Sequence, residues 1–338
     1  MSAKRVLVTG GTGFIGAALV KGLLETGHEV RVLDNNSRGS MRRLDAVAGD
    51  FDLHCGDIRD ARSVTAAMNG MDAVCHLAYI NGTEFFYQRP DEVLDVAIRG
   101  MLNVLDACCS EDVGELVLAS SSEVYQTPPA VPTGESVPLS VPDVLNPRYS
   151  YGGGKILCEL MAVNYGRRYL DRVLIFRPHN VYGPDMGWEH VIPQFARRMA
   201  ELSGSESDPL PFPIQGNGRQ TRAFVYISDF TDGLLRVIGR GEHLGIYHIG
   251  TDHEVTIAEV AHEVAACYGR RIDIVPGEEP AGATPRRCPD ISKLRELGYE
   301  PCVSLGEGVE KTVGWYREHA DLRGGSTEKS LQRAPATA

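Results

Sequence analysis

The sequence predicts an α/β fold in which a doubly wound parallel sheet is joined to a smaller, interleaved lobe. Short apolar segments alternate with helix-length amphipathic segments through the first half of the chain. Strands that alternate with helices pair in parallel through crossover connections, so helices cover both faces of the sheet. The first apolar segment also runs directly into three glycines that open a helix. A sheet of this kind binds ligands at the carboxyl ends of its strands.

The elements of the first half follow from the apolar pattern and from the residues that interrupt it. Residues 6–9 predict a strand, and residues 14–25 a helix that Gly27 ends, since glycine adopts the backbone conformation of a helix end without strain. Further apolar segments of strand length, bounded by polar residues, predict further strands. These strands are expected at 30–33, 51–55, 73–78 and 115–120, with helices at 61–68 and 91–109.

Prolines and serines divide the second half of the chain. Six prolines between residues 127 and 147 prevent long regular structure there, and a second connector rich in serine and proline spans 203–213. A helix at 151–169 and a strand at 173–177 lie between the two connectors. Shorter elements are expected at 223–227, 230–238, 246–249, 257–268 and 271–275.

These patterns predict two domains and a tail. Residues 1–178 form the sheet domain, which also receives part of 220–250. Residues 179–322 form mainly the smaller lobe. Residues 323–338 are polar and without periodicity, which is typical of a disordered tail.

Composition excludes several classes of protein. The 338 residues are 43% hydrophobic and 23% charged, as in soluble globular proteins. A net charge of −11 argues against binding to nucleic acid or to an anionic membrane by bulk charge. No apolar run reaches the roughly 18 residues of a membrane span, and the first residues do not resemble a secretion signal. The eight cysteines form no Cys-x-x-Cys pair, so we expect a cytoplasmic protein with reduced thiols and no metal site.

Three glycines indicate a dinucleotide-binding turn. Gly10, Gly13 and Gly16 stand between the first predicted strand and the first helix. Gly10 permits the tight turn, Gly13 lets the backbone approach a pyrophosphate, and Gly16 lets the helix pack closely on the sheet. The N-terminus of the helix presents N–H groups to the anion. The strand and helix on either side distinguish this motif from glycines in an ordinary turn.

An acidic residue follows at the end of the second strand. A carboxylate at Asp34 accepts hydrogen bonds from the adenosine ribose and repels a 2′-phosphate, which favours NAD over NADP. The nearby Arg38 leaves NADP open, and Asp34 could instead be a turn residue before Asn35. Asp57 follows the third strand, where an adenine edge would lie, although a single carboxylate there is more often an ordinary loop residue.

Tyr151 and Lys155 are the candidate catalytic pair. They lie four residues apart at the start of a predicted helix and therefore share one face. A phenol with a pKa near ~10 is a poor base at neutral pH, but an ammonium one turn away and a bound nicotinamide would lower that pKa. The same spacing also occurs in exposed helix pairs. Ahead of the pair, the strand ending at Ser120 continues into Ser121, Ser122 and Glu123, at the edge where ligands bind.

Several motifs occur together in one order along the chain. They are TGGTGFIG at 9–16, His76-Leu77-Ala78, SSSEVY at 120–125, Tyr151 with Lys155, and RPHNVYGP at 177–184. The set resembles the extended short-chain dehydrogenase/reductase family, and specifically the NAD-dependent epimerase/dehydratase branch that acts on nucleotide sugars. The resemblance runs from about residue 4 to residue 317. It implies a Rossmann sheet domain, bound NAD and a nucleoside-diphosphate sugar as substrate.

The resemblance implies a role for each of the matching residues. Tyr151 would remove the proton of the sugar C4 hydroxyl while the C4 hydride passes to NAD, and Lys155 would bind the nicotinamide ribose. Ser121 takes the catalytic serine or threonine position. Asn180 would lie near the substrate phosphates, and Arg222 with Arg286 or Arg287 would contact the diphosphate. The implied cofactor-binding residues are Gly10, Gly13, Phe14, Ile15, Gly16, Asp34, Asn35, Asp57, Ile58, Leu77, Ala78, Tyr151 and Lys155.

The chain departs from the family pattern at four places that bear on substrate identity. Three glycines, 152–154, replace the usual small alanine or serine pair before the lysine and weaken the start of the helix. Ala223 stands where an aspartate commonly follows the arginine. Tyr79 replaces a second alanine after Ala78, and Gln126 replaces a glycine.

The residue at position 123 bears on which reaction follows C4 oxidation. A 4-keto sugar can return the hydride to the other face, lose the C6 hydroxyl after removal of the C5 proton, or lose a C6 carboxylate as carbon dioxide. Family epimerases usually have a small or uncharged residue here, whereas Glu123 resembles the glutamate of dehydratases and decarboxylases. We therefore favour an NDP-hexose 4,6-dehydratase with Glu123 as the C5 base. Ser122, where some relatives have an aspartic acid, is a poorer proton donor, and Glu123 could instead be a structural hydrogen-bond acceptor.

Other functions and assemblies stay open at this stage. The alternatives are an NDP-sugar 4-epimerase, an NDP-uronic acid decarboxylase and, from another class, a non-catalytic NAD(P)-binding sensor, which need not keep both Tyr151 and Lys155. By resemblance, the helices at 91–109 and 151–169 would pair across a two-fold axis in a homodimer. The apolar residues Val93, Val96, Leu160 and Val163 fit such an interface, but they also fit packing within one chain.

Overall fold

The computed structural model describes residues 3–278 and 284–324. The chain divides into two compact units. The sheet unit comprises Met1–Val181, Gln220–Val255 and Gly282–Val303. The small unit comprises Tyr182–Arg219, Thr256–Ala281 and Ser304–Ala338. Most of the predicted tail, residues 325–338, lies outside the described residues.

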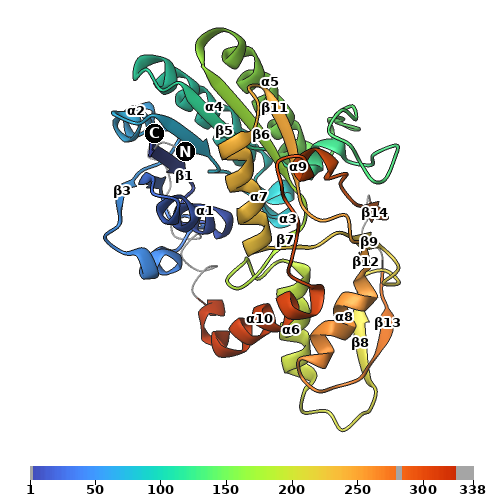
Figure 1. Ribbon diagram of the computed structural model, residues 1–338. Helices are drawn as coiled ribbons and strands as arrows, with labels where there is room; N and C mark the ends of the chain where they lie inside the picture. The colour runs from blue at the N-terminus through green and yellow to red at the C-terminus, as the bar shows by residue number, and fades with distance from the viewer. Residues whose placement is uncertain (1–2, 279–283, 325–338) are drawn as a thin grey trace, which may run out of the picture. The chain divides into compact units, whose positions relative to one another are not determined.

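A seven-stranded parallel sheet forms the centre of the sheet unit (Figure 1). The strands run in the order β11-β6-β5-β4-β1-β2-β3, so the chain starts in the middle and winds outward in both directions. This confirms the predicted doubly wound parallel sheet. Crevices that bind ligands form at such a reversal point, next to the carboxyl ends of β1 and β4. The strands are β1 (Arg5–Thr9), β2 (Glu29–Asp34), β3 (Phe51–Cys55), β4 (Ala73–His76), β5 (Glu115–Ala119), β6 (Arg172–Pro178) and β11 (Gly245–Ile249).

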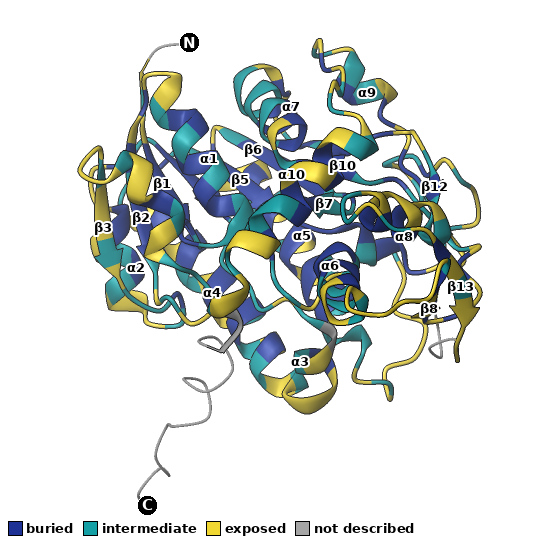
Figure 2. Ribbon diagram, turned by 90° about the horizontal axis from the view of Figure 1, so that it is seen from below, coloured by how far each residue is buried: buried dark blue, intermediate teal, exposed yellow. Residues whose placement is uncertain are grey.

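Helices cover both faces of this sheet, because side chains alternate between its faces along each strand (Figure 1). On β1, Val6 and Val8 pack on one side and Leu7 on the other. One face packs on α1 (Phe14–Glu25) and α7 (Ile227–Arg240), and the other on α2 (Ala61–Met68), α4 (Pro90–Ser110) and α5 (Tyr149–Tyr169). Figure 2 shows the edge strand β3 largely exposed.

Short elements complete the sheet unit. The 3-10 helices η1 (Met41–Val47) and η2 (Ser122–Tyr125) follow β2 and β5, and the short helix α3 (Thr83–Gln88) follows β4. Strands β9 (Thr221–Arg222) and β14 (Arg286–Arg287) pair in parallel. The other short elements of this unit are β10 (Val225–Tyr226) and α9 (Ser292–Arg295), while β7 (Val181–Tyr182) and β12 (Val255–Thr256) lie where the chain passes from one unit to the other.

The small unit contains three helices and a two-stranded parallel sheet among the described residues. The helices are α6 (Val191–Leu202), α8 (Ile257–Ala266) and α10 (Leu305–Glu318), the strands are β8 (Leu210–Ile214) and β13 (Ile272–Pro276), and η3 (Ala320–Gly324) follows α10. Capping boxes start two of the helices: Thr256 with Glu259 begins α8, and Ser304 with Glu307 begins α10.

Two sequence expectations need correction. The connector expected at 203–213 contains most of strand β8, in which Leu210, Phe212 and Ile214 are buried while Pro211 and Pro213 are exposed. Proline is tolerated because β8 belongs to a two-stranded sheet and is therefore an edge strand. The strand expected at 73–78 ends at His76, because Leu77 and Ala78 leave it to donate hydrogen bonds to the Thr9 hydroxyl.

Between residues 126 and 148 the chain forms no helix and no paired strand beyond one bridge at Thr133, as the six prolines predict. Within the described residues, no helix combines the length and the apolar character needed to cross a lipid bilayer.

Candidate active site

The glycine turn after β1 leaves no room for side chains. Gly10 has a φ of +75°, and a Cβ added there would lie 2.7 Å from the backbone nitrogen of Ala78. A Cβ on Gly16 would lie 2.1 Å from the Gly10 carbonyl oxygen. Gly13, the residue before α1, makes no capping hydrogen bond with a side chain. The first-turn N–H groups of Phe14, Ile15 and Gly16 are thus left for a ligand, and this turn fits the diphosphate of a dinucleotide.

Asp34 is held in place by backbone N–H groups of two loops. Its two carboxylate oxygens accept hydrogen bonds from the nitrogens of Thr12 (3.0 Å) and Asn36 (2.8 Å). Each oxygen keeps a further lone pair, as contact with the ribose hydroxyls of NAD requires. The side chain of Arg38, which left NADP open, stacks on the Phe85 ring, with its guanidinium carbon 4.7 Å from the ring centroid.

The expected adenine region is a connected polar group. Asn35 donates to Asp57 (3.0 Å), and Arg59 forms an ion pair with Asp57 at 2.7 Å. The Arg59 hydrogen bond holds the pKa of Asp57 below its ordinary value, although partial burial opposes this. The Ile58 side chain is buried against Gly100 of α4, and its carbonyl accepts a hydrogen bond from Asn103 (2.8 Å).

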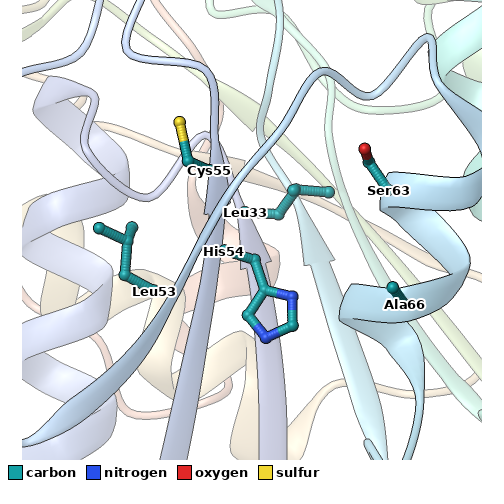
Figure 3. Close-up of a pocket in the computed structure, with 6 residues that line it drawn as sticks. All are labelled: Leu33, Leu53, His54, Cys55, Ser63 and Ala66. Atoms are coloured by element: carbon teal, nitrogen blue, oxygen red, sulfur yellow. The ribbon is translucent and has the colours of Figure 1, made fainter.

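Next to this group, a pocket of about 390 Å³ opens between β3 and α2 (Figure 3). Its lining residues are Leu33, Leu53, His54, Cys55, Ser63 and Ala66. In the sheet, Cys55 is paired with Asp34. None of the expected cofactor-binding residues, and neither residue of the candidate catalytic pair, lines this pocket.

Thr9 ties the ends of β1 and β4 together. Its hydroxyl lies 2.7 Å from Nδ1 of His76 and accepts hydrogen bonds from the nitrogens of Leu77 (3.2 Å) and Ala78 (3.3 Å). These bonds place Leu77 and Ala78 against the glycine turn. Sequence reasoning quoted Thr9 and His76 within motifs but gave neither of them this role.

The three serines after β5 have different surroundings. The Ser120 hydroxyl hydrogen-bonds the buried Glu159, which also forms an ion pair with the buried Arg177 at 2.6 Å. Ser121 accepts a hydrogen bond from the Glu123 nitrogen (3.1 Å), and its side chain is also hydrogen-bonded to Tyr151. Ser122 is buried at the start of η2. Of the three, Ser121 is thus the serine that contacts Tyr151.

Lys155 extends from α5 into a dry environment. Its Nζ donates a hydrogen bond of 2.7 Å to the Ala119 carbonyl, and only 4% of the residue is exposed. Burial lowers the pKa of Lys155 to about 8, although nearby Cys158 and Glu159 oppose this. Burial raises the pKa of Tyr151 to about 12, despite the hydrogen bond with Ser121. Without a cofactor, burial therefore outweighs the lowering of the Tyr151 pKa that the Tyr–Lys spacing predicts.

Aromatic rings surround Tyr151, the candidate catalytic tyrosine. Phe86 of α3 stacks on Tyr151 with ring centroids 4.9 Å apart, and Tyr79 meets it edge-on at 5.2 Å. Nζ of Lys155 lies 3.8 Å from the Tyr79 ring centroid. The sequence marked Tyr79 only as a departure from the family pattern, and it gave no sign of Phe86 as a neighbour of Tyr151.

The glycine run in α5 makes room for two of the other departures. A Cβ on Gly154 would lie 2.3 Å from the Tyr79 hydroxyl, and one on Gly152 would lie 2.6 Å from Nε2 of Gln126. Helix α5 begins at Tyr149, two residues before the predicted start, and continues through all three glycines.

Glu123 faces a group of arginines. It forms an ion pair with Arg287 and also interacts with the charges of Arg148 and Arg222. Burial by itself raises the pKa of Glu123, but the arginines outweigh burial and leave that pKa below its ordinary value. Glu123 is therefore a carboxylate at neutral pH.

The arginines proposed for the diphosphate are separated by the strand geometry. Arg287 is paired with Arg222 across β14 and β9, whereas Arg286 forms a half-exposed ion pair with Glu254 at 2.5 Å. Burial, together with Arg287, lowers the pKa of Arg222 to about 10. Asn180 donates to the Ala223 carbonyl (3.3 Å), which places it beside Arg222. Of the two alternatives, the structure brings Arg287 and not Arg286 toward Glu123.

Comparison with known proteins gives consistent results. A sequence model described as the NAD dependent epimerase/dehydratase family matches residues 6–250. The chain is 32% identical to a UDP-N-acetyl-alpha-D-glucosaminuronate decarboxylase of Bacillus cytotoxicus, over 93% of this chain and 98% of that protein.

Solved structures are similar over nearly the whole chain. A dTDP-glucose 4,6-dehydratase of Streptomyces venezuelae with bound NAD is 31% identical, with a TM-score of 0.83 over 94% of this chain and 98% of that one. A UDP-glucose 4-epimerase of Thermus thermophilus with NAD is 30% identical, with a TM-score of 0.81 over 93% and 99%.

The substitution Gly154→Ala is expected to lower the free energy of unfolding by about 1–3 kcal/mol, because the new Cβ would overlap the Tyr79 hydroxyl. Gly153→Ala is the matched control: its Cβ would meet only the Val141 side chain, at 3.5 Å, so helix propensity should stabilise it by up to about 1 kcal/mol. Adding Tyr79→Phe should restore most of the stability of Gly154→Ala. Chemical denaturation measures the free energy of unfolding of the three variants and of the wild type. Equal effects of the two alanines would contradict this account.

The substitution Lys155→Met is expected to raise the free energy of unfolding. The gain over wild type should be larger at neutral pH than at alkaline pH. A native pKa of about 8 against an ordinary 10.5 means that the unfolded chain binds the proton more tightly. Wild-type stability therefore rises between pH 8 and 10.5, a rise that the variant lacks. The stability difference between variant and wild type should fall by about 3 kcal/mol over this range. Urea denaturation at pH 7, 8, 9 and 10 measures it, and a difference independent of pH would refute the buried ammonium.

Proposed function

Because the chain belongs to the NAD-dependent epimerase/dehydratase family, we propose that it oxidises a nucleoside-diphosphate sugar at C4 through Tyr151 and then acts at C5 through Glu123. One observation carries the proposal. Ser121 hydrogen-bonds Tyr151 and also caps the turn that carries Glu123, so the groups for C4 and C5 are joined by a single residue. Neighbouring atoms of a sugar ring require neighbouring protein groups.

At C4, the proposed proton path runs through the tyrosine. Tyr151 takes the proton of the C4 hydroxyl, and Ser121 shares a hydrogen bond with the same oxygen. Lys155 holds a positive charge below the pair, which favours the phenolate. When bound, NAD supplies the electron acceptor for C4 and later returns the electrons. Its bound charge also adds to that of Lys155 in favouring the phenolate.

At C5, the proposed base is Glu123. A C4 carbonyl acidifies the C5 proton, and the neighbouring arginines keep Glu123 ionised and ready to accept it. Loss of the C6 hydroxyl then needs a proton. The Ser122 hydroxyl is too weak an acid, but Glu123 carries the proton just taken from C5 and can deliver it to the adjacent C6 oxygen. This sequence supports 4,6-dehydration.

Arg222 and Arg287 are the proposed diphosphate ligands. Their planar guanidinium groups suit bidentate pairing with phosphate oxygens, and their pairing across two strands puts both on the side of Glu123. Asn180 adds an amide beside them. In this proposal the diphosphate competes with Glu123 for Arg287.

Decarboxylation of an NDP-uronic acid is the second candidate, and a specific observation favours it. Loss of carbon dioxide needs no acid for a leaving hydroxide, and Ser122 provides none. The three arginines around Glu123 would also suit a substrate with an extra carboxylate. An epimerase, by contrast, would leave Glu123 without a chemical role.

A homodimer stays a proposal. Val93 and Val96 of α4 are buried within the chain and are therefore unsuited to a partner. The large hydrophobic residues that are exposed on α4 and α5 are Leu94, Leu102, Leu157, Leu160 and Tyr169.

The substitution Glu123→Gln is expected to reduce product formation about 10²–10⁴-fold while C4 oxidation continues, because the amide cannot take the C5 proton. UDP-, dTDP-, GDP-, CDP- and ADP-hexoses and the corresponding uronic acids would be incubated with each variant. NMR of the products and the absorbance of reduced cofactor separate the two steps. Glu25→Gln, at the exposed end of α1, is the matched control and should behave as wild type.

The product identifies the reaction. A C4 ketone or hydrate with a C6 methyl group supports dehydration, and release of carbon dioxide from a uronic acid supports the second candidate. Inverted C4 with C6 intact, formed equally well by Glu123→Gln, would refute both. In a thermal-shift assay, stabilisation by NAD but by no nucleoside diphosphate would instead favour a sensor.

A further inference from the structure

We propose that Tyr79 is a positioning residue whose ring face holds the Lys155 ammonium beside Tyr151 and keeps it protonated. This inference rests on the proposed function, since it assigns Lys155 to catalysis. It concerns a position where the chain departs from the family pattern. Three contacts of Tyr79 and Lys155 carry it.

The first contact is between the ammonium and the ring. Nζ of Lys155 lies 3.8 Å from the Tyr79 ring centroid, well within the distance of a cation–π interaction. The same nitrogen lies 5.9 Å from the Tyr151 centroid. Among the described residues, these two rings are the ones beneath the ammonium, and Tyr79 is by far the closer. Because the site is buried, the attraction is worth more than on a surface.

The second contact fixes the direction of the ammonium. Lys155 donates to the Ala119 carbonyl at 2.7 Å on the β5 side, and the Tyr79 ring lies against the same group. A lysine side chain has several rotatable bonds, so one hydrogen bond alone does not fix its end. A carbonyl and a ring face together hold the charge at one place, one helical turn from the catalytic phenol.

The third contact orients Tyr79 itself. Its hydroxyl lies 3.4 Å from the Tyr151 carbonyl oxygen, and its ring meets the Tyr151 ring edge-on at 5.2 Å. Gly154 leaves space for that hydroxyl, which a Cβ would approach to 2.3 Å. The helix that carries Tyr151 and Lys155 is thus shaped to accept this ring.

The other titratable groups near Lys155 do not stabilise its ammonium in place of the Tyr79 ring. His76 of β4 is buried, and burial lowers its pKa to about 3, so it is neutral at pH 7. On α5, Glu159 is already paired with Arg177. The titratable groups that face or influence the ammonium are Tyr79, His76, Tyr151, Cys158 and Glu159.

The test measures the protonation of Lys155 directly in the full chain. The protein is labelled with ¹³C-lysine, and the Lys155 Cε resonance, assigned by its loss in Lys155→Met, is followed against pH. In Tyr79→Leu, the acid dissociation constant of Lys155 should rise about 3- to 30-fold, because the ring attraction is lost. In Tyr79→Phe, which keeps the ring, it should stay within about 2-fold of wild type.

Phe86→Leu is the control for general packing. Phe86 stacks on Tyr151 but is not one of the rings under the ammonium, so this variant should leave the Lys155 titration unchanged. The alkaline limb of the kcat profile with the accepted sugar should shift to lower pH in Tyr79→Leu alone, with KM nearly unchanged. Circular dichroism of each variant checks that the chain is folded.

The outcomes separate the inference from the function on which it rests. If Lys155 titrates in folded Tyr79→Leu as it does in wild type, or if Phe86→Leu shifts it equally, the inference is wrong. If the Lys155 titration shifts in Tyr79→Leu but the protein converts no nucleotide sugar, the proposed function is refuted. The interaction of Tyr79 with Lys155 is still supported by that result. Should Tyr79→Leu fail to fold, Tyr79→Met provides the same comparison with a flexible side chain.

Discussion

A single ammonium group, buried away from water, is the constraint on which the candidate active site depends. Burying an unpaired charge is costly, so Lys155 needs compensating contacts wherever it lies. The Ala119 carbonyl and the Tyr79 ring provide them, and both come from the carboxyl edge of the sheet. These contacts fix how α5 lies against β5. The position of Tyr151, and through Ser121 that of η2, follows from this packing.

Two of the departures from the family pattern, Tyr79 and Gln126, are compensated by glycines of α5. Tyr79 and Gln126 each bring a larger side chain against α5, and Gly154 and Gly152 each remove a Cβ that would overlap it. Gln126 in turn donates a hydrogen bond of 2.6 Å to the Glu123 carbonyl. Because α5 lacks these two Cβ atoms, the Tyr79 side chain has room to hold Lys155. The Gln126 side chain has room to hold the turn that carries Glu123. A glycine run that weakens a helix in isolation is stable here because packing outweighs propensity.

The sequence predicts best what is enforced locally. The spacing of Gly10, Gly13 and Gly16 is set by contacts within one strand–turn–helix, so it identifies the dinucleotide turn without knowledge of the rest. Sequence reasoning missed the short helices α3 and α9 and two longer helices, α6 and α10, which lie in the small unit. For α10 a signal was present, since Ser304 and Glu307 have the spacing of a capping box.

Long-range side-chain partners could not be predicted in the same way. Arg286 and Arg287 are adjacent in the sequence, and side chains alternate across a strand, so only the pairing of β14 with β9 decides which one meets Glu123. The same limit applies to Tyr79 and Phe86, whose contact with Tyr151 depends on how α3 folds back onto α5. Local spacing likewise shows the ammonium but not the exclusion of water, and in the chain without a cofactor burial raises the pKa of Tyr151.

In the proposed function, the charge balance around Glu123 links substrate binding to catalysis. Three arginines surround one carboxylate, and their attraction outweighs the effect of burial on its pKa. A diphosphate that takes Arg287 would remove the main partner of Glu123, and burial would then make the carboxylate a stronger base just as the sugar arrives. A uronic acid would bring a further negative charge to the same place, which Arg148 would have to neutralise. Under the proposed function, the choice between dehydration and decarboxylation would therefore depend on whether this cluster balances a diphosphate alone or a diphosphate together with a carboxylate.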